Sequence, residues 1–283
     1  MAHAEMGRGH VSVSGEHGAP ACDTAERPHD GPLQVPSPAP ESSTARADAA
    51  LERALDYLAG LEANPHLLLS LDLFHRRFGY ERFRDSLARY DEVMAHAPPD
   101  AALELRALRR MLDPNNAMGP EDRSPCVPTV DRLTCPALYC DRLPAPPAYA
   151  MMLRGSVETG RYLLTHVGLT MMLARDLGCT GLVPADVQTA TISGMTKLVA
   201  RDGRVTDLEL EAATFLTYLG YGDHVAEGFT EDVLAGQRPS GGWALDSASP
   251  QQPDSWHATC NAAWYLLESR PASGVRPPMG PRR

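Results

Sequence analysis

Long apolar runs are absent from this sequence of 283 residues. No window of about 18 or more residues is both apolar and uncharged, so no helix is predicted to span a membrane. Positive charge is also scarce, because 26 Lys and Arg residues stand against 36 Asp and Glu residues and leave a formal net charge of −10. Since phosphate groups are bound mainly by Lys and Arg, this balance argues against nucleic acid as the main partner.

Apolar periodicity is missing from both ends of the chain. Residues 1–46 are rich in Pro and Gly, and residues 271–283 have a similar composition. Such stretches bury too little apolar surface to offset the entropy of ordering, so both are predicted to be disordered tails. The first fifteen residues contain no apolar stretch of the kind found in secretory signals. We therefore expect a cytoplasmic protein whose six cysteines are reduced.

Alternating strand patterns are missing as well, whereas a period near 3.6 residues begins at Ala47. Leu51, Leu55 and Leu58 fall on one face of a helix. The pattern predicts an all-α domain over residues 47–270, interrupted by an irregular Pro-rich loop over 113–147. After the first helix, the predicted helices span residues 67–78, 81–96, 100–112, 156–178, 184–200, 206–220, 224–236 and 254–269.

One motif carries more information than the periodicity. Gln237, Gly241 and Trp243 have the spacing Q-x-x-x-G-x-W and lie between two predicted helices. A Gln amide at this place can hydrogen-bond backbone groups at helix ends, and Gly allows a tight turn. The segment resembles the repeat of squalene and oxidosqualene cyclases. The resemblance implies an α/α toroid, in which paired helices surround a central cavity.

The next helix strengthens that resemblance. Asp254, Trp256 and His257 stand where the D-x-Y-H-T segment of protein prenyltransferase β-subunits has Asp, Tyr and a zinc-binding His, although Ala258 replaces the Thr. The resemblance therefore implies a metal role for His257. The catalytic D-x-D-D segment of squalene cyclases, the D-D-x-x-D of terpene synthases and the Asp-x-Cys pair of prenyltransferases are all missing. The architecture is thus predicted more firmly than the reaction.

Two predicted inner helices supply most of the candidate site. His257 has Cys260 and Asn261 three and four residues further on, so an imidazole, a thiol and an amide share one helical face. His166 lies in a very apolar helix with Tyr162 one turn before it. Imidazole and thiolate groups from different inner helices could converge on a metal ion. The alternative is that each His is a hydrogen-bonded core residue.

Two further residues complete the candidates. Cys140, followed by Asp141, is a possible thiolate ligand from the loop. Glu158, near His166, is a possible substrate-orienting or catalytic group, and the alternative is an ion pair with Arg161 three residues further on. The alternative for the cysteines is a small buried apolar residue.

Asp207 and Glu211 belong to the first turns of the helix over 206–220, where acids complement the helix dipole. We interpret them as solvated or capping groups, with a place facing the cavity as the alternative for Glu211, which shares a helix face with Asp207 and Phe215.

The functional prediction is an enzyme of small-molecule metabolism, such as natural-product biosynthesis, with its site in a central cavity. It would use a divalent transition metal (zinc, iron or copper) or acid/base groups, as a lyase, hydrolase or oxidoreductase. The metal ligands would be His166, His257, Cys140 and Cys260, and the catalytic groups Tyr162, Glu158 and Asn261. Two alternatives remain: a terpene cyclase-like enzyme without the usual Asp motif, and a non-catalytic helical binding module. Neither a membrane span nor a particular oligomeric state is predicted.

Overall fold

Helices account for most of the chain in a computed structural model, which describes residues 42–117, 131–199, 203–271 and 274–279. All of these belong to one compact unit, Glu41–Arg283. The predicted helical class is confirmed. The α-helices among the described residues are α1 (Ser43–Ala59), α2 (Pro65–Phe78), α3 (Ser86–Ala95), α4 (Pro99–Leu108), α5 (Asp131–Leu138), α6 (Tyr149–Thr159), α7 (Arg161–Asp176), α8 (Ala185–Leu198), α9 (Asp207–Leu219), α10 (Phe229–Ala235) and α11 (Trp256–Glu268).

The described residues also contain three short 3₁₀ turns, one small hairpin and an isolated β-bridge between Thr206 and Asp246. The turns are η1 (Glu81–Phe83), η2 (Arg109–Met111) and η4 (Gly222–His224). The strands β1 (Trp243–Ala244) and β2 (Asp254–Ser255) pair in antiparallel fashion, with Trp243 opposite Ser255. The sequence pattern predicts no strand, because two residues are too few to alternate.

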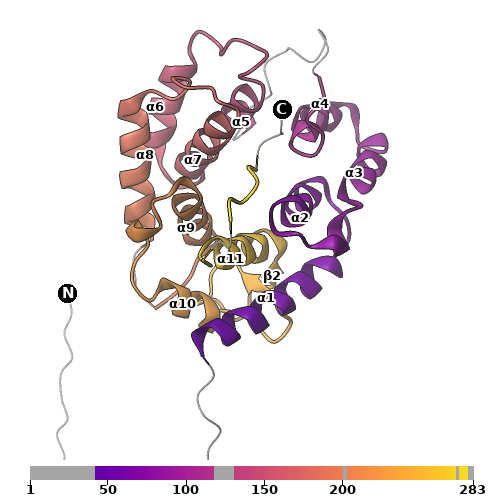
Figure 1. Ribbon diagram of the computed structural model, residues 1–283, viewed down its shortest axis with the longest axis vertical. Coiled ribbons are helices and arrows are strands. Elements are labelled where there is room, and N and C mark those ends of the chain that lie inside the picture. The colour runs from indigo at the N-terminus through magenta and orange to yellow at the C-terminus, as the bar shows by residue number, and fades with distance from the viewer. Residues whose placement is uncertain (1–41, 118–130, 200–202, 272–273, 280–283) are drawn as a thin grey trace, which may run out of the picture. The chain divides into compact units, whose positions relative to one another are not determined.

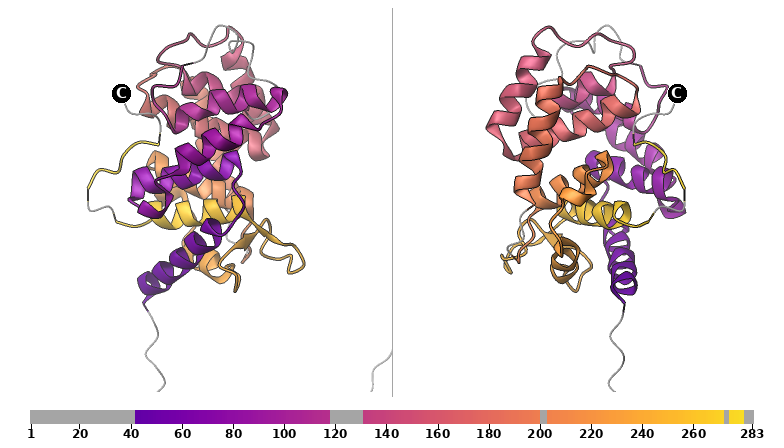
Figure 2. Two further views of the ribbon diagram at one scale, coloured as in Figure 1. Left: turned by 90° about the vertical axis from the view of Figure 1, so that its right-hand side faces the viewer. Right: turned by 60° about the vertical axis from the view of Figure 1, so that its left-hand side comes forward.

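The central helices, α9 and α11, have the largest share of buried residues. Ten of the thirteen residues of α9 and eleven of the thirteen residues of α11 are buried, against five of seventeen in α1. Helix α9 packs against α7, α8 and α11. Helix α11 also contacts α1 and α2, so the first helices of this unit lie beside its last one (Figures 1 and 2). The Leu51 face predicted for α1 is the buried one.

The predicted helix over 156–178 is wrong at its start. The structure has two helices there, α6 and α7, separated by Gly160 with φ 73° and ψ −159°. Glycine adopts this backbone at little steric cost, and the apolar pattern continues across the break. The periodicity therefore does not reveal where one helix ends and the next begins.

Two other predictions need correction. The loop predicted over 113–147 contains α5, whose Pro136 lies inside the helix; part of that loop, 118–130, lies outside the described residues. The disordered tail predicted over 271–283 includes residues 274–279, which are described, and Met279 there is 1% exposed. Tertiary contacts hold this segment in place despite its composition. Most of the tail predicted over 1–46 also lies outside the described residues, although α1 begins at Ser43.

The Q-x-x-x-G-x-W motif makes a tight turn that joins α10 and β1 to α1. The Gln237 amide donates to the carbonyl oxygens of Ala50 in α1 (2.7 Å) and Gly241 (2.9 Å). The indole of Trp243 is 1% exposed and donates to the Val233 carbonyl (2.8 Å). The Gln237 amide therefore bonds backbone carbonyls in the middle of α1 and in its own turn. The sequence predicts bonds to backbone groups at helix ends instead.

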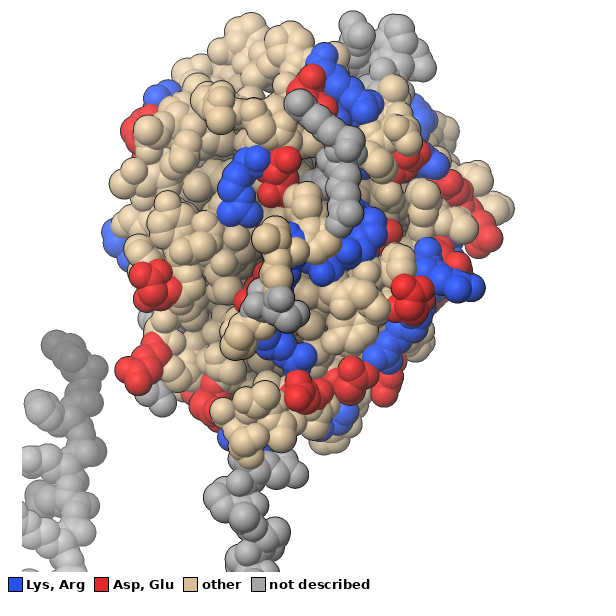
Figure 3. All heavy atoms as spheres, in the orientation of Figure 1, with Lys and Arg blue, Asp and Glu red and all other residues tan. Residues whose placement is uncertain are grey.

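Charge on the surface is mixed. In Figure 3, basic and acidic side chains lie next to one another along the side where α1 and α3 are found. Arg82 of η1, for example, pairs with Glu52 (2.5 Å) and Asp56 (2.6 Å) of α1. The excess of acidic residues thus forms no continuous patch on this face. None of the helices described is both long and apolar enough to cross a membrane.

Candidate functional site

Three central helices bring their N-terminal turns to one place. Tyr162 is the second residue of α7, Asp207 is the first of α9 and His257 is the second of α11. The start of α9 is fixed by a capping box, in which Thr206 accepts from the Glu209 amide (3.3 Å) and the Glu209 carboxylate accepts from the Thr206 amide (2.7 Å). Capping of this kind defines where the helix begins and hence where Asp207 projects.

Asp207 is the centre of a hydrogen-bond network. It is 2% exposed and accepts hydrogen bonds from the Tyr162 hydroxyl (2.8 Å), from Nδ1 of His257 (2.8 and 2.9 Å to its two oxygens) and from the Asn261 amide (3.2 Å). Burial alone would raise the pKa of Asp207. The hydrogen bond and charge of His257 outweigh burial, together with the hydrogen bonds from Tyr162 and Asn261, and hold this pKa below its usual value. The carboxylate is therefore ionised and fully engaged.

Glu211 lies one turn further along α9, and its carboxyl group is less fully hydrogen-bonded than that of Asp207. It is 2% exposed, and its Oε2 atom has no hydrogen-bond partner. Oε1 is 3.5 Å from Nδ1 of His166, and Oε2 is 4.0 Å from Nε2 of His257. Burial raises the pKa of Glu211, while the two imidazoles and a hydrogen bond from Thr165 oppose this effect. Two carboxyl groups on one helix thus have pKa values shifted in opposite directions.

The imidazoles are oriented by their Nδ1 atoms. Nδ1 of His257 faces the Asp207 carboxylate, which can only accept, so Nδ1 carries the hydrogen. The same carboxylate raises the pKa of His257, although burial alone would lower it. Nδ1 of His166 lies 2.8 Å from the Tyr162 carbonyl oxygen and donates to it. The Nε2 atoms of both rings are left for other partners.

A group of potential metal ligands results from this arrangement. Asp207, Glu211 and His257 each offer a ligand atom within 4.8 Å of the others, and this is the one such group of three within the described ranges. Carboxylate oxygen and imidazole nitrogen are common ligands of zinc, iron and copper.

The group faces a cavity of about 700 Å³, a size typical of small-molecule sites. Its polar lining includes His166, His257, Asp207 and Glu211, together with His66, Ser70, Arg76, Thr134, Tyr162 and Asn261. Its apolar lining consists of Leu69, Leu73, Leu108, Met111, Leu169, Phe215, Leu245, Trp256, Trp264 and Met279. A second depression of about 690 Å³ lies over α2, α3 and α4. It is more open and holds no group of clustered ligand atoms among the described residues.

Most of the predicted site residues meet here. His166, His257, Tyr162 and Asn261 all line the cavity, as does Cys260. Neither the His166 imidazole nor the Cys260 thiol belongs to the ligand group of Asp207, Glu211 and His257. Burial raises the pKa of Cys260 to about 12, which favours the neutral thiol. The metal and catalytic roles assigned to these residues stay predictions.

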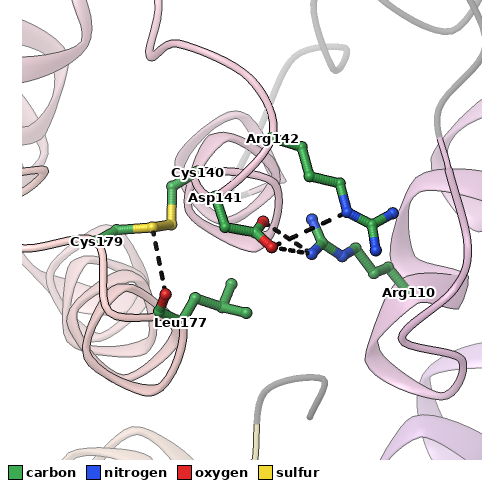
Figure 4. The surroundings of a disulfide bond; sticks show 6 residues. All are labelled: Arg110, Cys140, Asp141, Arg142, Leu177 and Cys179. Atoms are coloured by element: carbon green, nitrogen blue, oxygen red, sulfur yellow. Dashed lines mark hydrogen bonds and ion pairs between the residues drawn. A yellow bond between two sulfur atoms is a disulfide. The ribbon is translucent and has the colours of Figure 1, made fainter. Parts of the chain in front are cut away.

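Cys140 does not reach the site. It forms a disulfide with Cys179, 39 residues further along the chain, and a disulfide sulfur is not a thiolate ligand (Figure 4). The expectation that all cysteines are reduced is wrong for this pair. The neighbouring Asp141 pairs instead with the buried Arg110 (2.8 Å). Sequence spacing gives no indication of this pairing, because the two cysteines belong to different loops.

Glu158 is also outside the site. It is exposed near the end of α6, and Gly160 separates it from the helix that carries His166. The sequence interpretation missed Asp207 and preferred the wrong alternative for Glu211, because both residues are buried and not solvated. One signal was present: α9 is apolar on nearly every side, and charged residues on such a helix cannot all reach water.

Comparison with models of protein families, with curated proteins and with solved structures gives no match for this chain.

Proposed function

We propose that this protein is a metal-dependent enzyme that acts on a small molecule in the cavity between α2, α7, α9 and α11. A divalent transition metal (zinc, iron or copper) would be held by Glu211 and His257, with His166 as the third ligand. The observation that carries this proposal is the Oε2 atom of Glu211, which is buried and has no hydrogen-bond partner. An ionised carboxylate in such a place is costly unless a cation accompanies it.

The distances are compatible with one bound ion. Metal–ligand bonds to nitrogen and oxygen are about 2.0–2.2 Å long, so two ligands of one ion lie at most about 4 Å apart. Nε2 of His257 and Oε2 of Glu211 are 4.0 Å apart. Nδ1 of His166, which donates to the Tyr162 carbonyl, lies 3.5 Å from Oε1 of Glu211, so this ring is next to the same carboxylate and Nε2 would be its ligand atom. The Asp207 carboxylate accepts a hydrogen bond from Nδ1 of His257, across the ring from Nε2. A carboxylate is a usual second partner of a metal-binding His.

Each residue around the ion has a defined task. Asp207 fixes the ring of His257, and Tyr162 and Asn261 fix Asp207 by hydrogen bonds. A metal ion in this place can polarise a carbonyl group or lower the pKa of a bound water molecule. The apolar walls, such as Phe215 and Trp264, bind the substrate and exclude water.

The helix arrangement supports an α/α toroid as the architecture of this site. The buried helices α7, α9 and α11 alternate along the chain with α6, α8 and α10, and α11 contacts α1 and α2. In a toroid the inner helices run in parallel and present their N-terminal ends to one side of the cavity. Tyr162, Asp207 and His257 lie in the N-terminal turns of α7, α9 and α11 and line one cavity, as this architecture would require.

A second candidate is acid/base catalysis by the same residues without a metal. The opposite pKa shifts of Asp207 and Glu211 favour it, because a paired acid and base need one carboxyl group that holds its proton more tightly than the other. The two candidates differ in whether Glu211 carries a proton or faces a metal ion.

Metal binding by the purified full chain separates them. The protein is stripped with a chelator, titrated with Zn²⁺, Fe²⁺ and Cu²⁺, and analysed for bound metal after desalting. We expect one ion per chain for one of these metals, and a loss of at least about tenfold in affinity for Glu211→Gln and His257→Ala. His96→Ala, which changes an exposed histidine of the α3 end, is the control. Occupancy that is absent, or equal in all variants, would refute the metal centre.

A further inference from the structure

A short segment outside the helices crosses the far end of the cavity. In the view of Figure 1, residues 274–279 run in front of α2 and α9, and Figure 2 shows them outside the helices. The Arg276 guanidinium donates to the Glu268 carboxylate (2.8 Å), to the Glu268 carbonyl (2.8 Å) and to the Arg270 carbonyl (2.6 Å). Arg77 of α2 donates to the carbonyl of Pro277. The segment is therefore attached to both α2 and α11.

Met279 is the residue of this segment that enters the interior. Its backbone N–H lies 2.8 Å from the Asp176 carboxylate and 2.7 Å from the Tyr218 hydroxyl. Its side chain is 1% exposed and lines the cavity. By contrast, Val275 in the same segment is fully exposed. The hydrogen bonds of the Met279 backbone thus hold its apolar side chain in the interior.

The positions of its partners show which end of the cavity Met279 occupies. Asp176 is the last residue of α7, and Tyr218 is the last but one of α9. Asp207 is the first residue of α9, eleven residues before Tyr218. At 1.5 Å per residue, the two ends of this helix are about 16 Å apart. The polar group around Asp207 and the side chain of Met279 therefore line the same cavity from opposite ends.

We propose that Met279, held by residues 274–279, closes the far end of the cavity and sets the length of the apolar substrate that the site accepts. The substrate class is an elongated apolar molecule with a polar group at the Asp207–His257 end. This inference rests on the proposed function for the role of the polar end. The length limit itself depends only on the cavity and on Met279.

The length limit can be measured with straight-chain 1-alkanols as probes. Trp256 and Trp264 line the cavity, so binding is followed by tryptophan fluorescence of the metal-free full chain. Affinity should rise about fourfold per added methylene until the chain reaches Met279, and then stop rising. In Met279→Ala the rise should continue for about two or three further methylenes, because that many heavy atoms are removed. Val275→Ala is the matched control and should keep the wild-type limit.

A second measurement works on the wild-type protein and does not depend on how the variant folds. With ¹³C-labelled methionine methyl groups, the Met279 signal should shift only for alkanols close to the limiting length. The exposed Met151 should not respond. Three outcomes would overturn the proposal. They are a failure of every alkanol to bind, a length limit that is unchanged in Met279→Ala, and a Met279 signal that does not shift with any bound alkanol. Since no metal is present, these results do not depend on the metal test of the proposed function.

Discussion

At the scale of single residues, the site depends on how Asp207 holds its neighbours. Asp207→Asn keeps the size of the side chain but removes the charge that fixes the protonated Nδ1 of His257. We expect metal affinity to fall about 10- to 100-fold, the usual cost of losing the second partner of a metal-binding His. Titration calorimetry measures the change, and Asp186→Asn, on the exposed surface of α8, should leave affinity unaltered. Equal affinities in the two variants would mean that Asp207 has no positioning role.

Single residues also show which part of the site could be predicted from the sequence. His166 and His257 are conspicuous in apolar helices, so the sequence identifies both. Asp207 and Glu211 have the sequence signature of ordinary first-turn acids, and only the packing of α9 between α7, α8 and α11 makes them buried. Burial by neighbouring helices is a tertiary property. The local sequence around an acid does not contain it.

Gly241 offers a test of the Q-x-x-x-G-x-W turn. Its φ is +93°, and a Cβ atom there would lie 2.4 Å from the Arg53 carbonyl oxygen of α1. Gly241→Ala should lower the free energy of unfolding by at least about 1–2 kcal/mol from the backbone conformation alone. Gly155 lies in the exposed middle of α6, with no atom near the added methyl group. Gly155→Ala should instead raise stability by about 0.5–1 kcal/mol. Denaturant unfolding of both variants gives the two signs.

At the scale of elements, the disulfide ties the loop after α5 to the turn after α7 (Figure 4). Cross-linking residues 39 apart restricts the unfolded chain, which corresponds to about 4 kcal/mol in the loop-entropy model. We therefore expect the double variant Cys140→Ser with Cys179→Ser to unfold at clearly lower denaturant concentration. The wild-type protein in reducing buffer should behave in the same way. If reduction leaves the midpoint unchanged, the bond contributes nothing to stability.

Element boundaries show what periodicity can and cannot predict. The helical class and most helix cores follow from the 3.6-residue pattern, because burying one face is what stabilises an amphipathic helix. The break between α6 and α7 does not, since it depends on the backbone of Gly160 and not on a change in hydrophobicity. That break decides that Glu158 and His166 belong to different helices.

At the scale of the whole unit, a buried ion pair joins its beginning to its end. Arg77 of α2 donates to the Glu268 carboxylate of α11 (2.6 and 3.0 Å), and both side chains are less than a tenth exposed. Arg276 binds the same carboxylate from residues 274–279. Nothing in the sequence predicts this pairing, because the partners are 191 residues apart. Its members also hold the segment that carries Met279.

Removing one side of this pair tests whether the contact between α2 and α11 stabilises the whole unit. Glu268→Leu leaves two arginines without their carboxylate, so we expect a loss of about 3–5 kcal/mol in the free energy of unfolding. Arg46→Met, which breaks the half-exposed pair with Glu231, should change stability by less than about 1 kcal/mol. Adding Arg77→Met to Glu268→Leu should recover part of the loss, because one of the uncompensated charges is gone. A Glu268→Leu variant as stable as Arg46→Met would show that α2 and α11 are held together by apolar contacts alone.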